Sequence, residues 1–176
     1  MIRQQRMRVE LPAVLALGSN LGDREATIRD AVRRIGEIPG VVVVKSSGLV
    51  ETPALKPEGV DVDAPAYLNA VVAVRSALGA HALLHELNRI EAEFGRVRDI
   101  RWGDRTLDID IVQFAGPPID DTDLTIPHPR AWERAFVLAP WLEIEPDAAL
   151  PGRGHIADLL ADAGEPPTPF PAEALS

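Results

Sequence analysis

The stretch YLNAVVAVRSALGAHALLHELNRIEAEFG, residues 67–95, decides the fold. Its first ten residues are rich in valine and predict a strand, with Tyr67, Asn69 and Val71 on one side. The remainder changes to helical spacing, with apolar residues three and four positions apart. Gly95 then marks the end of the helix, because glycine readily adopts the left-handed conformation that terminates helices. A strand leading directly into a helix is one half of a mixed α and β fold.

The segments on either side complete the pattern. AVLALGSN (residues 13–20) predicts a short apolar strand, followed by a helix capped by Asn20 or Asp23. IPGVVVVKSSGLVE (residues 38–51) predicts a turn and then a β-branched strand, and TLDIDI (residues 106–111) predicts the last strand. The β-α-β-β-α-β order predicts an α+β fold, a ferredoxin-like α/β sandwich with C-terminal additions. Helices are expected on one face of a mostly antiparallel sheet.

Length and composition narrow the classes of function. The 176 residues suit one domain over residues 12–163, with an N-terminal extension (1–11) and a proline-rich tail (164–176) that we expect to pack poorly. A net charge of -9 argues against nucleic-acid and membrane partners. The chain has no cysteine, which excludes disulfides and a cysteine nucleophile. With no apolar signal segment in MIRQQRMRVE, we expect a cytoplasmic protein. Separately, we expect it to be a monomer.

RWGDRTLDIDI (residues 101–111) places two carboxylates, Asp108 and Asp110, on one face of the last predicted strand. Like charges about 7 Å apart do not stabilise each other, so this face is either open to water or faces something positive. Paired aspartates suit Mg²⁺, and the arginines just before them suit phosphate oxygens. Together they are typical of phosphoryl transfer. Arginines that simply pair with surface aspartates would give the same pattern, and the residues alone leave both readings open.

Other residues fit a phosphorylated or heterocyclic ligand. His128 lies between two prolines in TIPHPR, so its ring is either aimed at a phosphate or bonded to the backbone of a turn. Tyr67 and Asn69 would suit a flat heterocycle with a polar edge. Two long loops, residues 52–66 and 95–104, are expected to act as lids.

Read in order, ALGSNLGD, ETPAL, YLNAVV, GRVR, RWGDRTLDIDI, TIPHPR and ERAFVLAP resemble the 6-hydroxymethyl-7,8-dihydropterin pyrophosphokinase family. The likeness extends from about residue 13 to about residue 160. It implies transfer of pyrophosphate from ATP to 6-hydroxymethyl-7,8-dihydropterin, a step of folate biosynthesis in which AMP leaves. It also implies two Mg²⁺ ions held by Asp108 and Asp110, which would account for the paired charges.

The resemblance implies roles for individual residues. The catalytic set is Arg96, Arg105, Asp108 and Asp110. The ATP-binding set is Asn88, Glu91, Arg98, Trp102, Ile111, Thr125, His128 and Arg134. The pterin-binding set is Thr52, Pro53, Leu55, Tyr67, Asn69 and Phe136. The chain departs from the family pattern in four places. The loop from Arg98 to Trp102 looks one residue shorter than in some members, and KPEGVDVDAPA (residues 56–66) is an acidic, longer variant of the second loop. Asp123 stands where some members carry arginine, and Pro129 where some carry tyrosine.

Two other functions use the same residues. A Mg²⁺-dependent phosphohydrolase would share the aspartates and arginines but has no evident use for Tyr67, Asn69 and Phe136. A non-catalytic nucleotide-binding module would keep its binding after either aspartate is replaced by alanine. Pterin binding and the identity of the nucleotide product therefore discriminate among the three.

Overall fold

The structure is a computed structural model that describes residues 9–56, 58–95 and 106–175. The strands are β1 Leu11–Ser19, β2 Val41–Ser46, β3 Leu49–Thr52, β4 Ala54–Lys56, β5 Gly59–Asp61, β6 Tyr67–Ser76, β7 Asp108–Phe114, β8 Ile119–Asp120, β9 Thr125–Ile126, β10 Ala149–Leu150, β11 Gly154–His155 and β12 Thr168–Phe170. The helices are α1 Arg24–Glu37, α2 Ala80–Glu93, α3 Ala135–Ile144 and α4 Ile156–Asp162, with a 3₁₀ turn at Ala131–Glu133.

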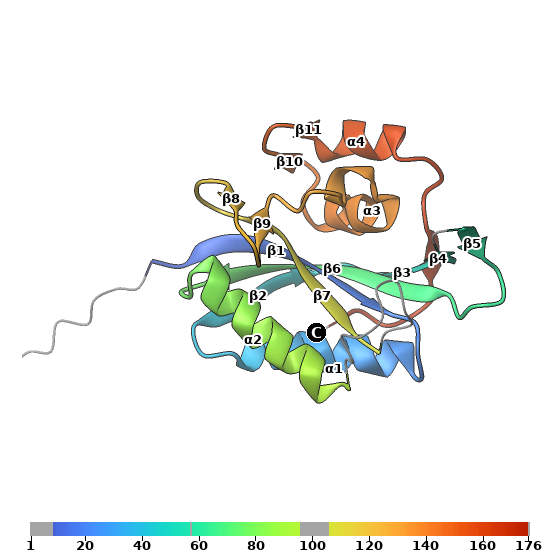
Figure 1. Cartoon of the computed structure of the whole chain (residues 1–176), viewed down its shortest axis with the longest axis horizontal. Coiled ribbons are helices and arrows are strands. Elements are labelled where there is room, and N and C mark those ends of the chain that lie inside the picture. Colours follow the sequence, from blue (N-terminus) through green and yellow to red (C-terminus); the bar gives the residue numbers. More distant parts are fainter. Residues whose placement is uncertain (1–8, 57, 96–105, 176) are drawn as a thin grey trace, which may run out of the picture.

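The main sheet reproduces the predicted architecture. Its strand order is β12-β3-β6-β1-β7, with β2 also paired to β6, and every pairing is antiparallel. Helices α1 and α2 lie together on one face of this sheet (Figure 1). The ferredoxin-like α+β prediction is therefore confirmed.

Local signals explain where the first two helices begin and end. The Asp23 side chain accepts a hydrogen bond from the Ala26 amide at 3.0 Å, which caps α1. Gly95 follows α2 with a φ of 79°, a conformation that favours glycine. The buried side chains of α1 are Ile28, Ala31, Val32 and Ile35. This spacing places one apolar stripe against the sheet.

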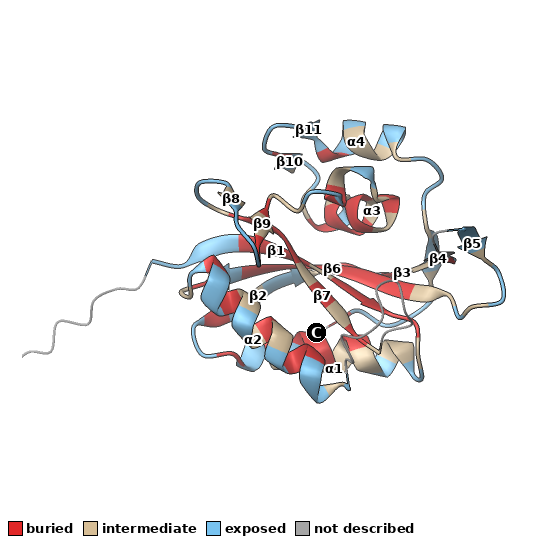
Figure 2. Cartoon of the chain, in the orientation of Figure 1, coloured by how far each residue is buried: buried red, intermediate tan, exposed pale blue. Residues whose placement is uncertain are grey.

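The other face of the sheet carries two helices, which corrects the expectation that helices cover one face alone. Helix α3 lies on this face, which we call the α3 face, and α4 packs on the outer side of α3 (Figure 1). Their second core includes Val71 of β6 and Leu138 and Trp141 of α3, all buried (Figure 2). The sequence of α3, AFVLAPWLEI, is apolar nearly all round, so it shows no single helical stripe.

The C-terminal tail is packed, so the expectation of a poorly packed tail is wrong. β12 pairs with β3. Leu175 is 7% exposed and lies in the first core, the cluster of buried apolar side chains between the sheet and helices α1 and α2. An edge strand tolerates proline because its outer amides need no partner in the sheet. The proline content therefore did not exclude a strand at this edge.

Only the first of the two long loops, residues 52–66, can be compared with the expectation. Within residues 52–66, β4 pairs with β5 to form a hairpin where we expected an open loop. The 95–104 loop lies outside the described residues except for Gly95. No helix in the described ranges combines the length and the apolar content that a bilayer crossing requires.

Candidate active site

Asp108 and Asp110 begin β7, and both are partly exposed. The alternating Ile109 and Ile111 are buried in the core beneath α1 and α2. This follows from the two-residue period of a strand. The prediction that the two carboxylates share one face is confirmed, and that face is the α3 face.

The strand register places small residues between the polar side chains. Gly18 of β1 is opposite Asp108 on one side and Asn69 on the other. Two residues earlier, Ala16 is likewise opposite Asp110 and Val71. Strands lie about 4.8 Å apart, so this row forms a shallow floor between the carboxylates and the Asn69 amide.

Gly18 is tightly surrounded on this floor. A methyl group there would lie 3.2 Å from the Asn69 Oδ1 atom and 3.8 Å from the Tyr67 ring. Gly18 does not have a positive φ, so its backbone imposes no need for glycine. The absence of a side chain at Gly18 instead leaves space above β1 at this position.

Asn69 and Tyr67 converge over Gly18, as the strand pattern predicted. Asn69 is 5% exposed, and its Nδ2 donates to the Thr52 Oγ1 atom at 3.0 Å. Thr52 is in turn opposite Tyr67 in the pairing of β3 with β6. With its NH₂ group committed to Thr52, Asn69 presents a fixed carbonyl oxygen toward the Gly18 side.

The cationic Arg134 and the ring of His128 face Asp110, which answers the question raised by the paired aspartates. The Asp110 Oδ2 atom is 3.8 Å from His128 Nε2 and 3.9 Å from Arg134 Nη1. Arg134 precedes α3 directly. His128 is held beside β7 because its backbone N–H donates a hydrogen bond to the Val112 carbonyl oxygen at 2.9 Å. The aspartate side chains therefore lie on a partly exposed surface bordered by cationic and polar groups.

His128 is held neutral. Burial, aided by the charge of Arg134, lowers the pKa of His128 from 6.5 to about 4. Its Nδ1 accepts a hydrogen bond from the Arg130 amide at 3.1 Å. A neutral ring that accepts at Nδ1 carries its proton on Nε2, the atom that faces Asp110. The turn interpretation is confirmed, because Nδ1 accepts from the backbone, and Nε2 faces Asp110. The phosphate role stays a prediction.

Phe136 lies on the same face as the carboxylates. It follows Arg134 in the first turn of α3 and, like Ala16, packs against the second core. The Arg134 guanidinium carbon lies 5.8 Å from the Phe136 ring centroid. This contact orients the arginine and the aromatic ring together.

A cavity of about 260 Å³ adjoins Asp110. Its lining includes three residues of the predicted ATP set, Ile111, Thr125 and His128. Its rim is the β8–β9 turn, which Asp121 shapes by accepting hydrogen bonds from two amides. His81 Nε2 of α2 forms a hydrogen bond with the same carboxylate at 2.6 Å, a contact that no sequence pattern indicated.

Glu91 has a different environment from the one predicted. It is 1% exposed, and its Oε1 accepts a hydrogen bond at 2.7 Å from the Ile109 amide, between the two aspartates. This contact fixes the backbone of β7 from beneath the sheet. Asn88, one turn earlier on α2, is partly exposed.

Several predicted residues lie outside the described part of the chain. These are Arg96, Arg98, Arg101, Trp102 and Arg105, together with the side chain of Leu55. Their assigned roles stay predictions. Pro53 is described and exposed, directly after β3.

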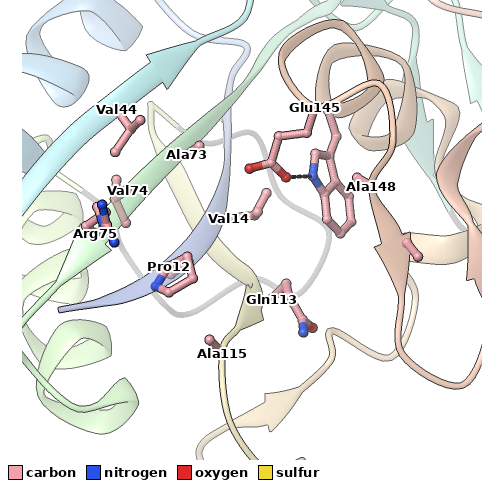
Figure 3. Close-up of a pocket in the computed structure, with 13 residues that line it drawn as sticks. Pro12, Val14, Val44, Ala73, Val74, Arg75, Gln113, Ala115, Glu145 and Ala148 are labelled. Atoms are coloured by element: carbon pink, nitrogen blue, oxygen red, sulfur yellow. Dashed lines mark hydrogen bonds between the residues drawn. The ribbon is translucent and has the colours of Figure 1, made fainter. Parts of the chain in front are cut away.

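A larger cavity, of about 450 Å³, lies at the other end of the α3 face (Figure 3). Its lining is mainly apolar, with Val14, Val44 and Ala73 among its residues. The Trp141 indole above it donates to Glu145 Oε2 at 2.8 Å, drawn as the dashed line in Figure 3. None of the predicted site residues lines this cavity.

Comparison with known proteins now shows the family. A sequence model of the 7,8-dihydro-6-hydroxymethylpterin-pyrophosphokinase (HPPK) family matches residues 14–146. The chain belongs to this family. Membership confirms the resemblance seen in the sequence and makes the chain an HPPK, an ATP-dependent pyrophosphokinase of folate biosynthesis.

Individual relatives agree. The chain is 44% identical over 140 residues to the 2-amino-4-hydroxy-6-hydroxymethyldihydropteridine pyrophosphokinase of Methylorubrum extorquens, covering 80% of this chain and 86% of the relative. It is 39% identical to that of Haemophilus influenzae, covering 85% and 91%. A solved Plasmodium falciparum HPPK-DHPS with pterin and p-hydroxybenzoate gives a TM-score of 0.67 at 16% identity, over 87% of this chain and 43% of that one. The chain spans under half of that longer protein, and the likeness supports the fold alone.

Proposed function

We propose that one end of the α3 face, the end that carries Asn69, Gly18 and Asp108 and that we call the open end, carries out the HPPK reaction in this chain. This reaction transfers pyrophosphate from ATP to 6-hydroxymethyl-7,8-dihydropterin. The observation that carries the proposal is the row Asn69, Gly18, Asp108, in which a fixed amide and a carboxylate flank a bare floor. In the reaction, the pterin hydroxyl oxygen bonds to the β-phosphorus and loses its proton. The bond from that phosphorus to the α-phosphate oxygen breaks, and AMP leaves.

The residues fit a magnesium site. Asp108 and Asp110 offer partly exposed carboxylate oxygens, the donors that Mg²⁺ prefers. No group of three or more metal-ligating acids or histidines occurs within the described ranges. That suits Mg²⁺ in kinases, which takes most of its remaining oxygens from phosphates and water. When bound, two Mg²⁺ ions would neutralise phosphate charge and acidify the attacking hydroxyl.

The pterin ring would occupy the space over Gly18, bordered by Thr52, Tyr67 and Asn69, which we call the pterin slot. The Asn69 carbonyl oxygen accepts from a ring N–H group, and the Tyr67 face stacks on the ring. Phe136 supplies the second aromatic face. Leu55 and Pro53 contribute contacts from the segment after β3.

The triphosphate would lie along Asp110 toward the cavity lined by Ile111 and Thr125. A neutral His128 donates from Nε2 to a phosphate oxygen and is better suited to this than to giving up a proton. Arg134 adds positive charge beside it. We assign the ATP-binding or catalytic roles taken from the family to Asn88, Arg96, Arg98, Trp102 and Arg105. Glu91, buried beneath β7, acts in this proposal by holding the strand that carries the aspartates.

We further propose a monomer that works in the cytoplasm, with one pyrophosphokinase domain over residues 12–163. The family match over residues 14–146 supports that span. Analytical ultracentrifugation of the purified chain would test the monomer.

The test of the reaction is a product assay. The protein is incubated with ATP, Mg²⁺ and the pterin, and the nucleotides are resolved by chromatography. AMP with a pterin diphosphate, formed only when metal and pterin are both present, is the expected result. ADP with free phosphate would indicate the phosphohydrolase instead, and ATP binding without turnover would indicate a binding module.

A further inference from the structure

Residues 168–175, which we call the strap, lie beyond the family match that ends at residue 146. Their first part is β12, in which Thr168 is opposite Glu51 and Phe170 is opposite Leu49 on β3. Their last described residue, Leu175, is buried among the side chains of the first core. The strap therefore forms the edge strand of the sheet, and its end packs into the first core.

Arg24 of α1 joins the strap to two other segments. Its Nη1 atom donates to the Glu51 Oε2 atom at 2.8 Å and to the Ala66 carbonyl oxygen at 2.6 Å. Its guanidinium carbon lies 5.9 Å from the centroid of the Phe170 ring. The arginine is three-quarters buried, so one side chain ties β3, the chain before β6 and the strap together.

These two segments lead directly into the pterin slot. Glu51 precedes Thr52, and Ala66 precedes Tyr67. Thr52 and Tyr67 are opposite each other in the register of β3 and β6. A change in the spacing of the two segments would therefore move the hydroxyl that fixes Asn69 and the ring that stacks on the ligand.

Helix α1 offers a graded series of arginines. Arg24 contacts both slot segments and the strap. Arg29 contacts the strap and its own helix: Nη1 donates to the Ala174 carbonyl oxygen at 2.9 Å, Nη2 to the Glu173 carbonyl oxygen, and Nε to Glu25 Oε1 at 2.9 Å. Arg33 forms its hydrogen bonds within α1, with Asp30 and Glu37. The helix thus supplies its own matched control.

We propose that the strap is a positioning element of the pterin slot and acts through Arg24. The proposal rests on the function proposed above, because it takes the space over Gly18 to be where the pterin binds. Loosening the strap then weakens pterin binding selectively. The predicted nucleotide residues Thr125, His128 and Arg134 lie beyond β7 or at the start of α3, away from this edge of the sheet.

The test uses the full-length chain and the variants R24A, R29A, R33A and F170A. Calorimetric titration with 6-hydroxymethyl-7,8-dihydropterin, in the presence of a non-hydrolysable ATP analogue, measures pterin affinity. We expect R24A to lose about tenfold in affinity, F170A and R29A about threefold, and R33A none. KM for ATP and kcat should stay within about twofold throughout, because only the pterin side is displaced.

A conservative variant separates positioning from general stability. R24K keeps the positive charge but presents a compact ammonium instead of a planar fork, so we expect it to recover only part of the pterin affinity. Thermal melts of all variants accompany the titrations. A purely structural strap would lower the melting temperature of R24A and F170A and leave the pterin affinity of the folded protein unchanged, which would overturn the proposal.

The wild-type product assay distinguishes the two possible failures. If the wild type forms AMP and pterin diphosphate but R24A and F170A bind pterin as tightly as R33A, only the strap proposal is wrong. If the wild type forms no AMP in response to pterin, the proposed function fails and the strap proposal fails with it. Should R24A not fold, the F170A and R29A titrations decide.

Discussion

The two ends of the α3 face are built on the same three strands, β1, β6 and β7, and they differ in almost every other respect. At one end Gly18 and Ala16 form a bare floor between polar side chains. At the other, Val14 and Ala73 lie under Trp141 around a cavity of about 450 Å³. The larger cavity belongs to the apolar end. Converging polar groups, and not volume, therefore mark the site.

The register explains the contrast. Along β1 the residues on this face go from Val14 to Ala16 to Gly18, so side-chain volume decreases toward the site. Partners on β7 change over the same distance from Gln113 to Asp110 to Asp108. Side-chain volume on β1 and charge on β7 thus change together along the face, from the larger cavity to the carboxylates.

The largest effect we expect comes from removing charge at the open end. Asp110→Asn keeps the side-chain volume but removes the carboxylate that faces His128 and Arg134. We expect turnover to fall by a factor on the order of 10³, because several kcal/mol of charge stabilisation on the phosphates depends on the bound metal. Circular dichroism should stay that of the wild type, since the residue is partly exposed. Turnover within tenfold of the wild type would contradict the metal assignment.

A smaller effect concerns the buried histidine at the same end. The pKa of His128 is depressed to about 4 in the folded protein, so the unfolded chain binds more protons between about pH 6.5 and pH 4. Stability from this group is therefore complete above pH 6.5 and is lost as the pH falls toward 4, by up to about 3 kcal/mol.

His128→Gln removes this dependence. Urea unfolding in a chelating buffer at pH 7, 5.5 and 4.5 should give a stability that falls less steeply for the variant than for the wild type. Both proteins share the carboxylates that also titrate in this range. The difference between their pH profiles of unfolding free energy therefore reports on the histidine. Parallel pH profiles would mean that His128 is not held neutral in the folded protein.

The contrast between local and distant information explains what the sequence could predict. The strand period placed Asp108 and Asp110 on one face, and Asp23 and Gly95 marked helix ends, because each signal is contained in a few neighbouring residues. The order of elements then indicated the ferredoxin-like sandwich. The family resemblance named Tyr67 and Asn69, which the structure brings together over one glycine.

The features that escaped prediction depend on pairing across the sheet. Gly18 acquires its role only when β1 lies between β6 and β7, and nothing in GSN by itself specifies that register. The family resemblance placed Glu91 in the ATP-binding set, but its side chain is buried because α2 packs against β7. The strap was missed because its prolines suggested a loose tail, whereas an edge strand accepts them.

Gly18 tests the floor directly. In Gly18→Ala the new methyl group would meet the Asn69 Oδ1 atom at 3.2 Å, and Asn69 cannot withdraw freely because its amide is bonded to Thr52. We expect KM for the pterin to rise about tenfold, since crowding of a packed site costs on the order of 1 kcal/mol or more. KM for ATP should not change.

The melting temperature of the same variant serves as a control. Alanine restricts the unfolded chain more than glycine does, which offsets the crowding against Asn69, so the melting temperature of Gly18→Ala should stay close to that of the wild type. Gly79→Ala, where a methyl group would meet no atom within 4 Å, should leave both KM values unchanged. A pterin KM equal to the wild-type value in Gly18→Ala would show that the ring does not lie on this floor.

The smallest effect belongs to the apolar end. Gln113 lines the larger cavity, and its Oε1 atom is buried without a hydrogen-bond partner among the described residues. Gln113→Leu replaces this amide by an apolar group of similar size, so we expect the free energy of unfolding to rise by about 1 kcal/mol. Both KM values should be unchanged because the cavity lies at the far end of the strands. A loss of stability would mean that the oxygen is satisfied by a bound molecule, and a changed pterin KM would mean that the two ends of the face are coupled. In either case the division between a closed apolar end and an open polar end would no longer hold.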